Sequence, residues 1–256
     1  MSLHLTAELK TLAKDKGAHL VGVAPADRFQ GAPQGHHPTD LLRGAKSVVV
    51  VAHRFPLGLL EGGRFGNESE LVQDEEERWA LRTQVFSPGG AGFFYPTVNQ
   101  QLQLIAIQVA LFLEDHGHLA VPLPASGHRA SNRYALFSHR HAAVLAGLGE
   151  FGLNNLLLTP QYGPRVRLDS VITTAELEPD PLCDGPVCLG EEKCGLCLKM
   201  KECFGERYEL QMAGKTMRLA RFGGVCATPC DRDRPPFFRF CYGVCPIGKP
   251  GRTTSL

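Results

Sequence analysis

The stretch Ser47-Val-Val-Val-Val-Ala52 decides the fold. Four consecutive β-branched valines predict a central strand that is buried on both faces of a sheet. Upstream, residues 3–16 are predicted to form the first helix, which ends at Gly17, and residues 20–24 a short buried strand. This order of a helix, a strand and a buried strand indicates a domain that combines helices with a sheet.

Further elements are predicted downstream. Residues 97–116 form the clearest helix, because Val98, Leu102, Ile105 and Val109 recur at helical spacing and Gly117 follows as a stop. A second helix is predicted for residues 138–148. Two strands are then expected at residues 156–160 and 165–173, joined as a hairpin by a turn that contains Pro and Gly. The sequence therefore predicts an α+β domain of about 180 residues, which a Pro-rich boundary near residue 180 separates from the rest.

All nine cysteines of the 256-residue chain lie between residues 183 and 256. Cysteines that serve as small buried hydrophobes do not segregate in this way, so one end of the chain uses thiols for a task. Cys194-Gly-Leu-Cys197 can direct two thiolates to one metal site, and Cys245-Pro246 resembles the end of a bacterial ferredoxin ligand run. We therefore expect iron–sulfur binding in residues 181–256. Zinc and ordinary thiols are the alternatives, and zinc is disfavoured because no His follows Cys183.

Charge and hydropathy narrow the class of protein. The net charge is +1, so no global field attracts nucleic acid. Residues 199–256 hold 11 Lys and Arg against 5 Asp and Glu, a local excess that suits an acidic partner, RNA or the negative charge of thiolate-bound metal. No apolar run reaches the length of a membrane span, and the N-terminus lacks the pattern of a targeting peptide. We expect a cytoplasmic protein without a membrane partner.

Several motifs follow one another in the second half of the chain: Ala146-Gly-Leu-Gly-Glu-Phe-Gly152, Asn155-Leu-Leu-Leu-Thr-Pro160, Gly163-Pro-Arg-Val-Arg-Leu168, Thr173-Thr-Ala-Glu-Leu177 and Cys245-Pro-Ile-Gly248. In this order they resemble the superfamily of epoxyqueuosine reductases and reductive dehalogenases. The resemblance implies a nitroreductase-like α+β domain with a mixed sheet in residues 1–180, which holds cobalamin. It also implies a ferredoxin-like domain in residues 181–256 with [4Fe-4S] clusters, one or two in number, that pass single electrons to the corrinoid.

The chain departs from this superfamily at three places. Leu153 stands where the superfamily has a Lys after the glycine turn, and Met200 stands at the third cysteine of the ligand run. The position of the catalytic Asp of epoxyqueuosine reductases falls near Arg133, which has no neighbouring carboxylate. These departures disfavour tRNA as the substrate, so we expect a small-molecule substrate or a partner redox protein such as reduced ferredoxin or flavodoxin.

The candidate site residues follow from these motifs. The resemblance implies a Tyr supported by a cation as the proton donor, and Tyr134 with Arg133 is the pair that fits this role. His139 is a further catalytic candidate, although a surface or capping role for this His is the simpler alternative. The expected cofactor-binding residues are Tyr95, Asn99, Arg140, Gly147, Gly149, Gly152 and Asn154. The expected metal ligands are Cys188, Cys194, Cys197, Cys203, Cys226, Cys230, Cys241 and Cys245.

Three hypotheses about function remain. The first is an iron–sulfur, cobalamin-dependent reductase. The second is an electron carrier, or an activator that reduces the corrinoid of another protein without turnover of its own. The third is a zinc-stabilised module that binds RNA through the basic tail.

Overall fold

The computed structural model describes residues 2–58, 94–127, 135–199, 204–212, 214–222 and 243–249. In chain order the elements of the first part are α1 (Ser2–Asp15), β1 (Leu20–Pro25), a 3-10 helix η1 (Ala26–Phe29), α2 (Pro38–Leu41), β2 (Ser47–Arg54), α6 (Phe94–Asp115), β3 (Ala120–Pro122) and α7 (His139–Leu145). They continue with β4 (Glu150–Phe151), β5 (Leu157–Leu158), β6 (Val166–Thr173), α8 (Gly190–Lys193), a second 3-10 helix η2 (Leu196–Lys199), β7 (Phe204–Met212) and β8 (Lys215–Phe222).

The valine run forms β2, next to the centre of a four-stranded sheet with the order β1-β2-β6-β3. Its residues Val48 to Val51 are fully buried, as predicted from their β-branched side chains. The prediction of a mixed sheet is wrong for the described strands, because β1, β2, β6 and β3 are all paired antiparallel. A buried run of valines indicates burial on both faces, but it does not report the direction of the neighbouring strands.

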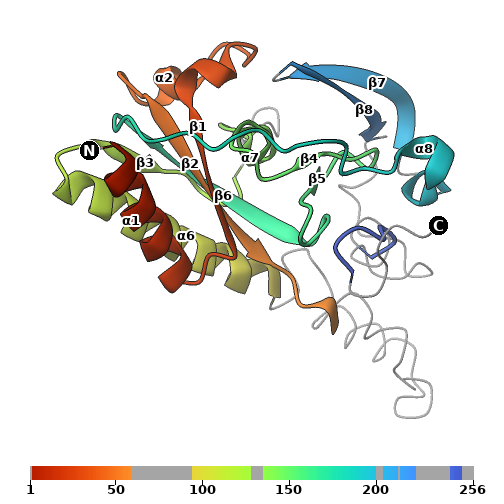
Figure 1. Ribbon diagram of the computed structural model, residues 1–256, viewed down its shortest axis with the longest axis horizontal. Helices are drawn as coiled ribbons and strands as arrows, with labels where there is room; N and C mark the ends of the chain where they lie inside the picture. The colour runs from red at the N-terminus through yellow and green to blue at the C-terminus, as the bar shows by residue number, and fades with distance from the viewer. Residues whose placement is uncertain are drawn as a thin grey trace.

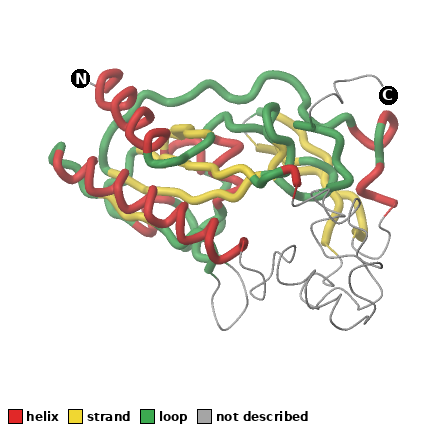
Figure 2. Tube along the Cα trace, turned by 90° about the horizontal axis from the view of Figure 1, so that it is seen from below, coloured by secondary structure: helices red, strands yellow, loops and turns green. Residues whose placement is uncertain are grey.

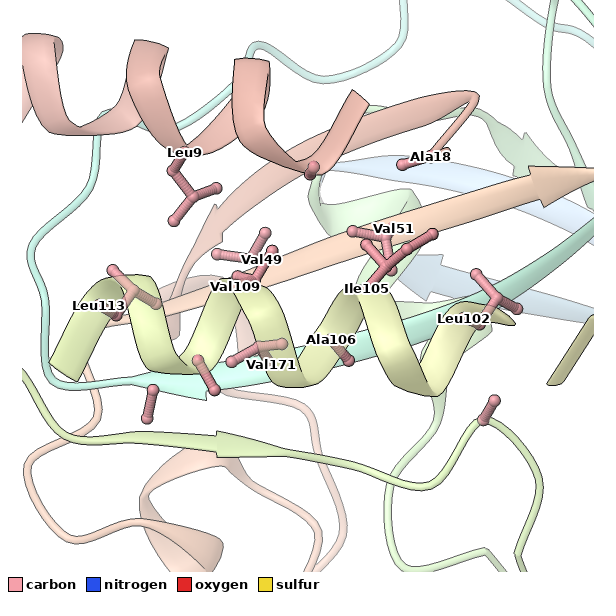
Figure 3. Close-up of a cluster of buried hydrophobic side chains, with 14 of the residues drawn as sticks. Leu9, Ala18, Val49, Val51, Leu102, Ile105, Ala106, Val109, Leu113 and Val171 are labelled. Atoms are coloured by element: carbon pink, nitrogen blue, oxygen red, sulfur yellow. The ribbon is translucent and has the colours of Figure 1, made fainter. Parts of the chain in front are cut away.

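Helices cover both faces of this sheet. The long helix α6 and the N-terminal helix α1 lie side by side against one face, and α7 lies against the other (Figures 1 and 2). Figure 3 shows the first of these layers, where Leu9 of α1 and Ile105 and Val109 of α6 meet Val49 and Val51 of β2. The predicted helices are confirmed here, and α1 and α6 are followed by Gly17 and Gly117 with φ of 106° and 82°.

The predicted hairpin between residues 156–160 and 165–173 is wrong. β5 pairs with β4, whereas β6 pairs with β2 and β3 in the main sheet. The turn between β5 and β6 is closed only by a bridge between Thr159 and Gly163. This turn therefore connects two sheets, which places the β4–β5 pair beside the edge of the main domain.

The boundary predicted near residue 180 coincides with an anchored segment. The Asp180 carboxylate accepts hydrogen bonds from the Lys10 ammonium at 2.6 Å and from the Val23 backbone N–H at 2.8 Å. The Arg28 guanidinium donates to the Asp180 carbonyl oxygen at 2.8 Å. The predicted division into residues 1–180 and 181–256 stays a prediction, and the segment that would link the two units is fixed to α1 and β1.

The β7–β8 hairpin was not predicted from the sequence. Met217 and Leu219 of β8 are buried in the same hydrophobic cluster as the residues of β2 and α7 that face away from α6. The Lys215 ammonium reaches back to the carboxylate of buried Glu150 at 2.8 Å. The hairpin therefore packs on the first 180 residues and forms one wall of the space next to α7.

The turn after α7 depends on close backbone packing. Gly147 has a φ of 74°, and a Cβ atom placed on it would lie 1.9 Å from the carbonyl oxygen of Pro181. A Cβ on Gly149 would lie 2.1 Å from the carbonyl oxygen of Leu158. Both glycines are therefore needed for the approach of neighbouring backbone, which is an alternative to their predicted role in cofactor binding.

We predict that Gly147→Ala reduces the free energy of unfolding by about 3 kcal/mol or more, because both the left-handed backbone and the contact with Pro181 are lost. Gly117→Ala is the matched control, since Gly117 also has a positive φ but no heavy atom lies within 4 Å of its Cβ position. It should cost about 1 kcal/mol. Urea unfolding followed by circular dichroism measures both, and equal losses would contradict the packing argument.

Candidate functional site: a cysteine pocket beside a cavity

Four cysteines line one pocket. Three of them, Cys188, Cys194 and Cys197, lie in and around the short helices α8 and η2, and Cys245 comes from the 243–249 segment. The remaining walls are mainly apolar: Leu153, Asn154, Leu158, Leu189, Gly190, Gly195, Leu196, Pro246 and Ile247. Cys183, the fifth described cysteine, is not among the lining residues. The fold therefore brings together the CxxC pair and the distant Cys-Pro cysteine, and their role as metal ligands stays a prediction.

Cys245 reaches the pocket because two glycine-containing turns touch. A Cβ on Gly163 would lie 2.0 Å from the Ile247 carbonyl oxygen, and a Cβ on Gly248 would lie 2.1 Å from the Tyr162 carbonyl carbon. The Arg165 guanidinium donates to the Gly248 carbonyl oxygen at 2.7 Å. In Figure 1 the dark blue 243–249 segment accordingly lies near β5 and α8.

The thiols of this pocket influence one another. Burial raises the pKa of Cys245 to about 12, and the charges of Cys188, Cys197 and Cys194 add to the effect. Burial also raises the pKa of Cys197 to about 11, again with contributions from Cys188 and Cys194. Four thiolates close together in apolar surroundings repel, so ionisation of all four needs positive charge between them.

The chemistry of the four donors fits thiolate-bound metal. Thiolates are the usual ligands of four-iron clusters, and they also bind tetrahedral zinc at about 2.3 Å from each sulfur. Among the residues that the structure describes, no three His, Cys, Asp or Glu side chains form a group that could hold a metal ion. By their chemistry the four thiols are therefore suited to either kind of centre.

A second, larger cavity of about 660 Å³ lies next to this pocket, between α7, β6 and the end of β7. Its walls are largely apolar, with Phe29, Phe137, Leu157, Leu210 and Met212 among them. Its polar lining consists of Arg28, His36, Ser138, His139, Arg140, His141, Arg167 and Gln211. A large apolar cavity with a few convergent polar groups is the usual form of a cofactor or substrate site.

The segment 153–158 separates the two spaces. Leu153, Asn154 and Leu158 line the cysteine pocket, whereas Leu156 and Leu157 line the cavity. Asn155 between them has a φ of 58° and accepts a hydrogen bond from Arg140, which also lines the cavity. Of the predicted cofactor-binding residues, Asn154 thus belongs to the cysteine pocket and Arg140 to the cavity.

His139, a predicted catalytic residue, uses both ring nitrogens within the protein. Its Nε2 donates to the Pro124 carbonyl oxygen at 3.0 Å, so its Nδ1 accepts from the Ser170 hydroxyl at 2.9 Å. Burial lowers the pKa of His139 to about 4, which keeps the ring neutral at pH 7. In this arrangement His139 positions β6 against α7 and has no proton to give to a ligand at neutral pH.

Two other histidines of the cavity keep one nitrogen available among the described contacts. His36 donates from Nδ1 to the Leu136 carbonyl oxygen at 2.9 Å, which leaves Nε2 as an acceptor. His141 forms its Nδ1 hydrogen bond with the Ser138 hydroxyl at 2.6 Å, and burial lowers its pKa to about 4. His36 was not predicted as a site residue because it lies in a Pro- and Gly-containing loop, which the sequence alone indicates to be solvated.

Arg167 links the cavity to the start of α6. Its guanidinium donates to the Asn99 side-chain oxygen at 3.0 Å and to the Tyr95 hydroxyl at 2.9 Å, and it lies 4.4 Å from the centre of the Tyr95 ring. Burial acts to raise the pKa of Tyr95, but the charge of Arg167 and the surrounding hydrogen bonds lower it overall. The predicted residues Tyr95 and Asn99 therefore hold a cationic wall of the cavity.

A buried carboxyl lies two residues further along β6. Asp169 is fully buried; its Oδ1 accepts from the Ser170 N–H at 2.7 Å, and its Oδ2 has no hydrogen-bond partner. Burial raises the pKa of Asp169 to about 7, against the lowering effect of Ser170 and Arg167. The signal for both residues was present in the sequence, since Arg167 and Asp169 are charged residues inside a strand that is otherwise without charge.

The other predicted site residues have different outcomes. Tyr134 and Arg133, together with Cys203, Cys226, Cys230 and Cys241, lie outside the described residues, so their roles stay predictions. Gly152, like Gly147 and Gly149, packs closely against its neighbours, because a Cβ atom on it would lie 2.6 Å from the Leu158 side chain.

No described helix combines the length and apolar character that a membrane crossing requires.

Comparison with known proteins finds relatives of this chain and solved structures with the same fold. A tetrachloroethene reductive dehalogenase of Dehalobacter restrictus is 36% identical over 206 residues, which are 72% of this chain and 34% of the relative. No sequence profile of a known family matches. The chain spans about a third of the length of the curated relatives that it matches. Its homologues are reductases.

Solved structures show the same fold at lower identity. Epoxyqueuosine reductase from Bacillus subtilis matches with a TM-score of 0.61 and 19% identity, over 96% of this chain and 66% of that one. The catabolic reductive dehalogenase NpRdhA matches with a TM-score of 0.62 and 17% identity, over 97% and 32%. The described elements define an α+β fold in which four cysteines surround one pocket. The relatives support the superfamily of reductive dehalogenases and epoxyqueuosine reductases, as the motifs predict.

We predict that the Asp169 carboxyl adds a downward slope to the dependence of stability on pH between about pH 4 and 7, opposite to the upward slope that the buried neutral rings of His139 and His141 contribute. In the folded state Asp169 keeps its proton up to about pH 7, whereas in the unfolded state it loses the proton near pH 4, so the stabilisation present at low pH is lost across this window. Asp169→Asn should remove this slope and stabilise the protein at pH 8 by on the order of 1 to 4 kcal/mol. Denaturant unfolding at several pH values measures it, with Asp115→Asn as an exposed control. An unchanged slope in Asp169→Asn would contradict the assignment.

Proposed function

We propose that the protein is an iron–sulfur reductase in which Cys188, Cys194, Cys197 and Cys245 hold a [4Fe-4S] cluster next to a corrinoid. The single observation that carries the proposal is the position of the four thiols around one pocket, which shares the wall formed by residues 153–158 with a cavity of about 660 Å³. When bound, the cluster supplies single electrons and the corrinoid supplies the reductive chemistry. The proposal thus combines three predictions from the sequence: an iron–sulfur cluster, cobalamin and reductase activity.

The residues of this chain have defined tasks in the proposal. The four thiolates bind iron, and the leucines and Pro246 around them keep water away from it. Segment 153–158 is the shared wall, so an electron would cross only a few side chains between pocket and cavity. Arg28, Arg140 and Arg167 give the cavity positive charge, which suits the phosphate of a corrinoid or an anionic substrate.

A second candidate function is a corrinoid-reducing activator or electron carrier that turns over no substrate. The state of His139 favours it, since this member of the predicted catalytic set is neutral and has both nitrogens engaged. The two candidates differ in their acceptor. A reductase consumes a small organic acceptor, whereas an activator reduces the corrinoid of a partner protein and leaves such acceptors unchanged.

The cluster is tested by iron and sulfide analysis after anaerobic reconstitution. We expect Cys245→Ser to lose most of its iron, because no other described residue replaces this ligand from the 243–249 side of the pocket. Cys183→Ser is the matched control and should retain its iron, since Cys183 lies outside the pocket. Zinc in place of iron in the wild type, or equal iron in both variants, would contradict this ligand set.

The corrinoid is tested separately by adding cobalamin to the reconstituted protein under anaerobic conditions. We expect a shift of the corrinoid absorption spectrum with a dissociation constant in the micromolar range or below. Leu157→Arg should weaken binding at least tenfold, because it places a long charged side chain in the apolar wall of the cavity. An unshifted spectrum with a loaded cluster would remove the corrinoid from the proposal and leave an iron–sulfur electron carrier.

A further inference from the structure

The long helix α6 has a second apolar face, which points away from the sheet. Its inner face packs against β2 (Figure 3), and Figure 2 shows the helix in front of the sheet, on the outside of the molecule. On the opposite side Leu104, Ile107 and Leu111 are 54%, 44% and 49% exposed. They are three and four residues apart, so they lie one above another and form a single apolar stripe, the outer stripe.

The outer stripe lies on a helix that carries almost no charge. From Phe94 to Leu113 α6 contains no Asp, Glu, Lys, Arg or His, and the polar neighbours of the stripe are Gln100, Gln103 and Gln108. A helix on the surface of a globular protein usually has charged residues on the side that faces water. Isolated exposed apolar side chains are common, but an aligned set on an uncharged helix indicates a contact surface.

The spacing of the outer stripe indicates which partner fits it. Leu104, Ile107 and Leu111 follow the alternation of the a and d positions of a coiled coil, whose seams pack against seams of the same kind. If a second copy of α6 is turned about a two-fold axis perpendicular to the helix beside Ile107, Leu104 of each copy faces Leu111 of the other. The outer stripe is therefore complementary to itself in an antiparallel arrangement.

The charges at the C-terminal end of α6 favour this direction over the parallel one. The helix ends in Glu114-Asp115, without a basic residue in its last turn. Two parallel helices would bring these acidic ends together, and like charges that face each other destabilise a contact. Antiparallel helices separate the acidic ends and place each of them at the uncharged start of the other helix.

A positive charge lies where the acidic end of the second copy would arrive. In the same antiparallel register Glu114 of one copy faces Gln101 of the other. The Gln101 side chain donates to the Lys16 carbonyl oxygen at 3.0 Å, so the end of α1 lies beside this position. Residues 14–16 are exposed and consist of two lysines and one aspartate, which leaves a net positive charge there. The two copies are therefore complementary in charge as well as in their apolar contact.

We propose that this chain forms a two-fold symmetric dimer in which the outer stripes of two antiparallel α6 helices pack against each other. Lys16 of each copy then lies next to Glu114 of the other. The inference does not depend on the proposed function, because none of these residues lines the cysteine pocket or the cavity. A contact built on one helix from each copy is at the small end of specific interfaces, so we expect a dissociation constant in the micromolar range.

The test is sedimentation velocity of the full chain, with a reductant present so that disulfides between copies do not contribute. We expect the wild type to change from monomer to dimer between about 1 and 100 µM. Ile107→Asp should raise the dissociation constant at least about a hundredfold, because it places two unpaired carboxylates in the centre of the contact. Leu136→Asp is the matched control and should leave the dimer intact, since Leu136 is 41% exposed but precedes α7 on the opposite face of the sheet.

Exchange of charges tests the direction of the helices. Lys16→Glu and Glu114→Lys should each weaken the dimer about threefold, because each change places like charges opposite each other. The variant with both changes should regain the wild-type dissociation constant, since the ion pair is restored with its charges exchanged.

The outcomes separate the contact from its direction. A wild type that is monomeric at about 100 µM overturns the inference, and so does a dimer that Ile107→Asp leaves intact. A dimer that Ile107→Asp disrupts but that the exchange of both charges does not restore overturns the antiparallel arrangement. If circular dichroism shows that Ile107→Asp does not fold, Leu104→Gln combined with Leu111→Gln takes its place, because α6 already carries glutamines beside the outer stripe.

Discussion

Backbone contact between the turn at Gly163 and the peptide at Ile247–Gly248 is the constraint on which the cysteine pocket depends. There is no room for a side chain at either glycine, since a Cβ on each would lie about 2 Å from backbone atoms of the other turn. The contact brings Cys245 to the three thiols of residues 188–197. Arg165 reinforces it by joining Gly248 to Phe55 after β2, so the pocket is fixed to the main sheet.

The main sheet in turn determines where the cavity lies. β6 pairs with β2 on one side and β3 on the other, so its residues present side chains to both helical layers. Val166 and Leu168 face the layer of α7, whereas Val171 faces that of α6. The α7 layer is completed by the β7–β8 hairpin, and the cavity lies between them. The same short segment, 153–158, then serves as a wall for both the cavity and the pocket.

Local patterns in the sequence predicted those parts of the structure that depend on local properties. The valine run, the amphipathic helix α6 and the glycine stops were correct, because burial and helical periodicity are visible within a dozen residues. Four of the eight cysteines expected to bind metal, Cys188, Cys194, Cys197 and Cys245, line the pocket. Motif order along the chain, rather than composition, supplied the superfamily.

Non-local choices could not be predicted in the same way. Whether residues 157–158 pair with β4 or with β6 depends on backbone contacts at Gly149 and Gly163 that a single sequence does not reveal. The β7–β8 hairpin alternates charged and apolar residues, but its partner in the core is distant in the chain. His36 lines the cavity, and its ring Nδ1 is hydrogen-bonded to the Leu136 carbonyl oxygen, which is distant in the sequence. The contacts of β8 and of His36 join residues that are far apart in sequence, whereas β4 and β5 are close in the chain but only two residues long each.

The contact at Gly248 has a consequence for biosynthesis. Three thiols of the pocket lie at residues 188–197, whereas the fourth belongs to a later segment that docks on a turn made about 85 residues before it. A contact of such long range forms only when both segments have left the ribosome, so the complete four-thiol pocket cannot form before the 243–249 segment has emerged. Assembly of the four thiols therefore follows the synthesis of the sheet that supports the turn at Gly163.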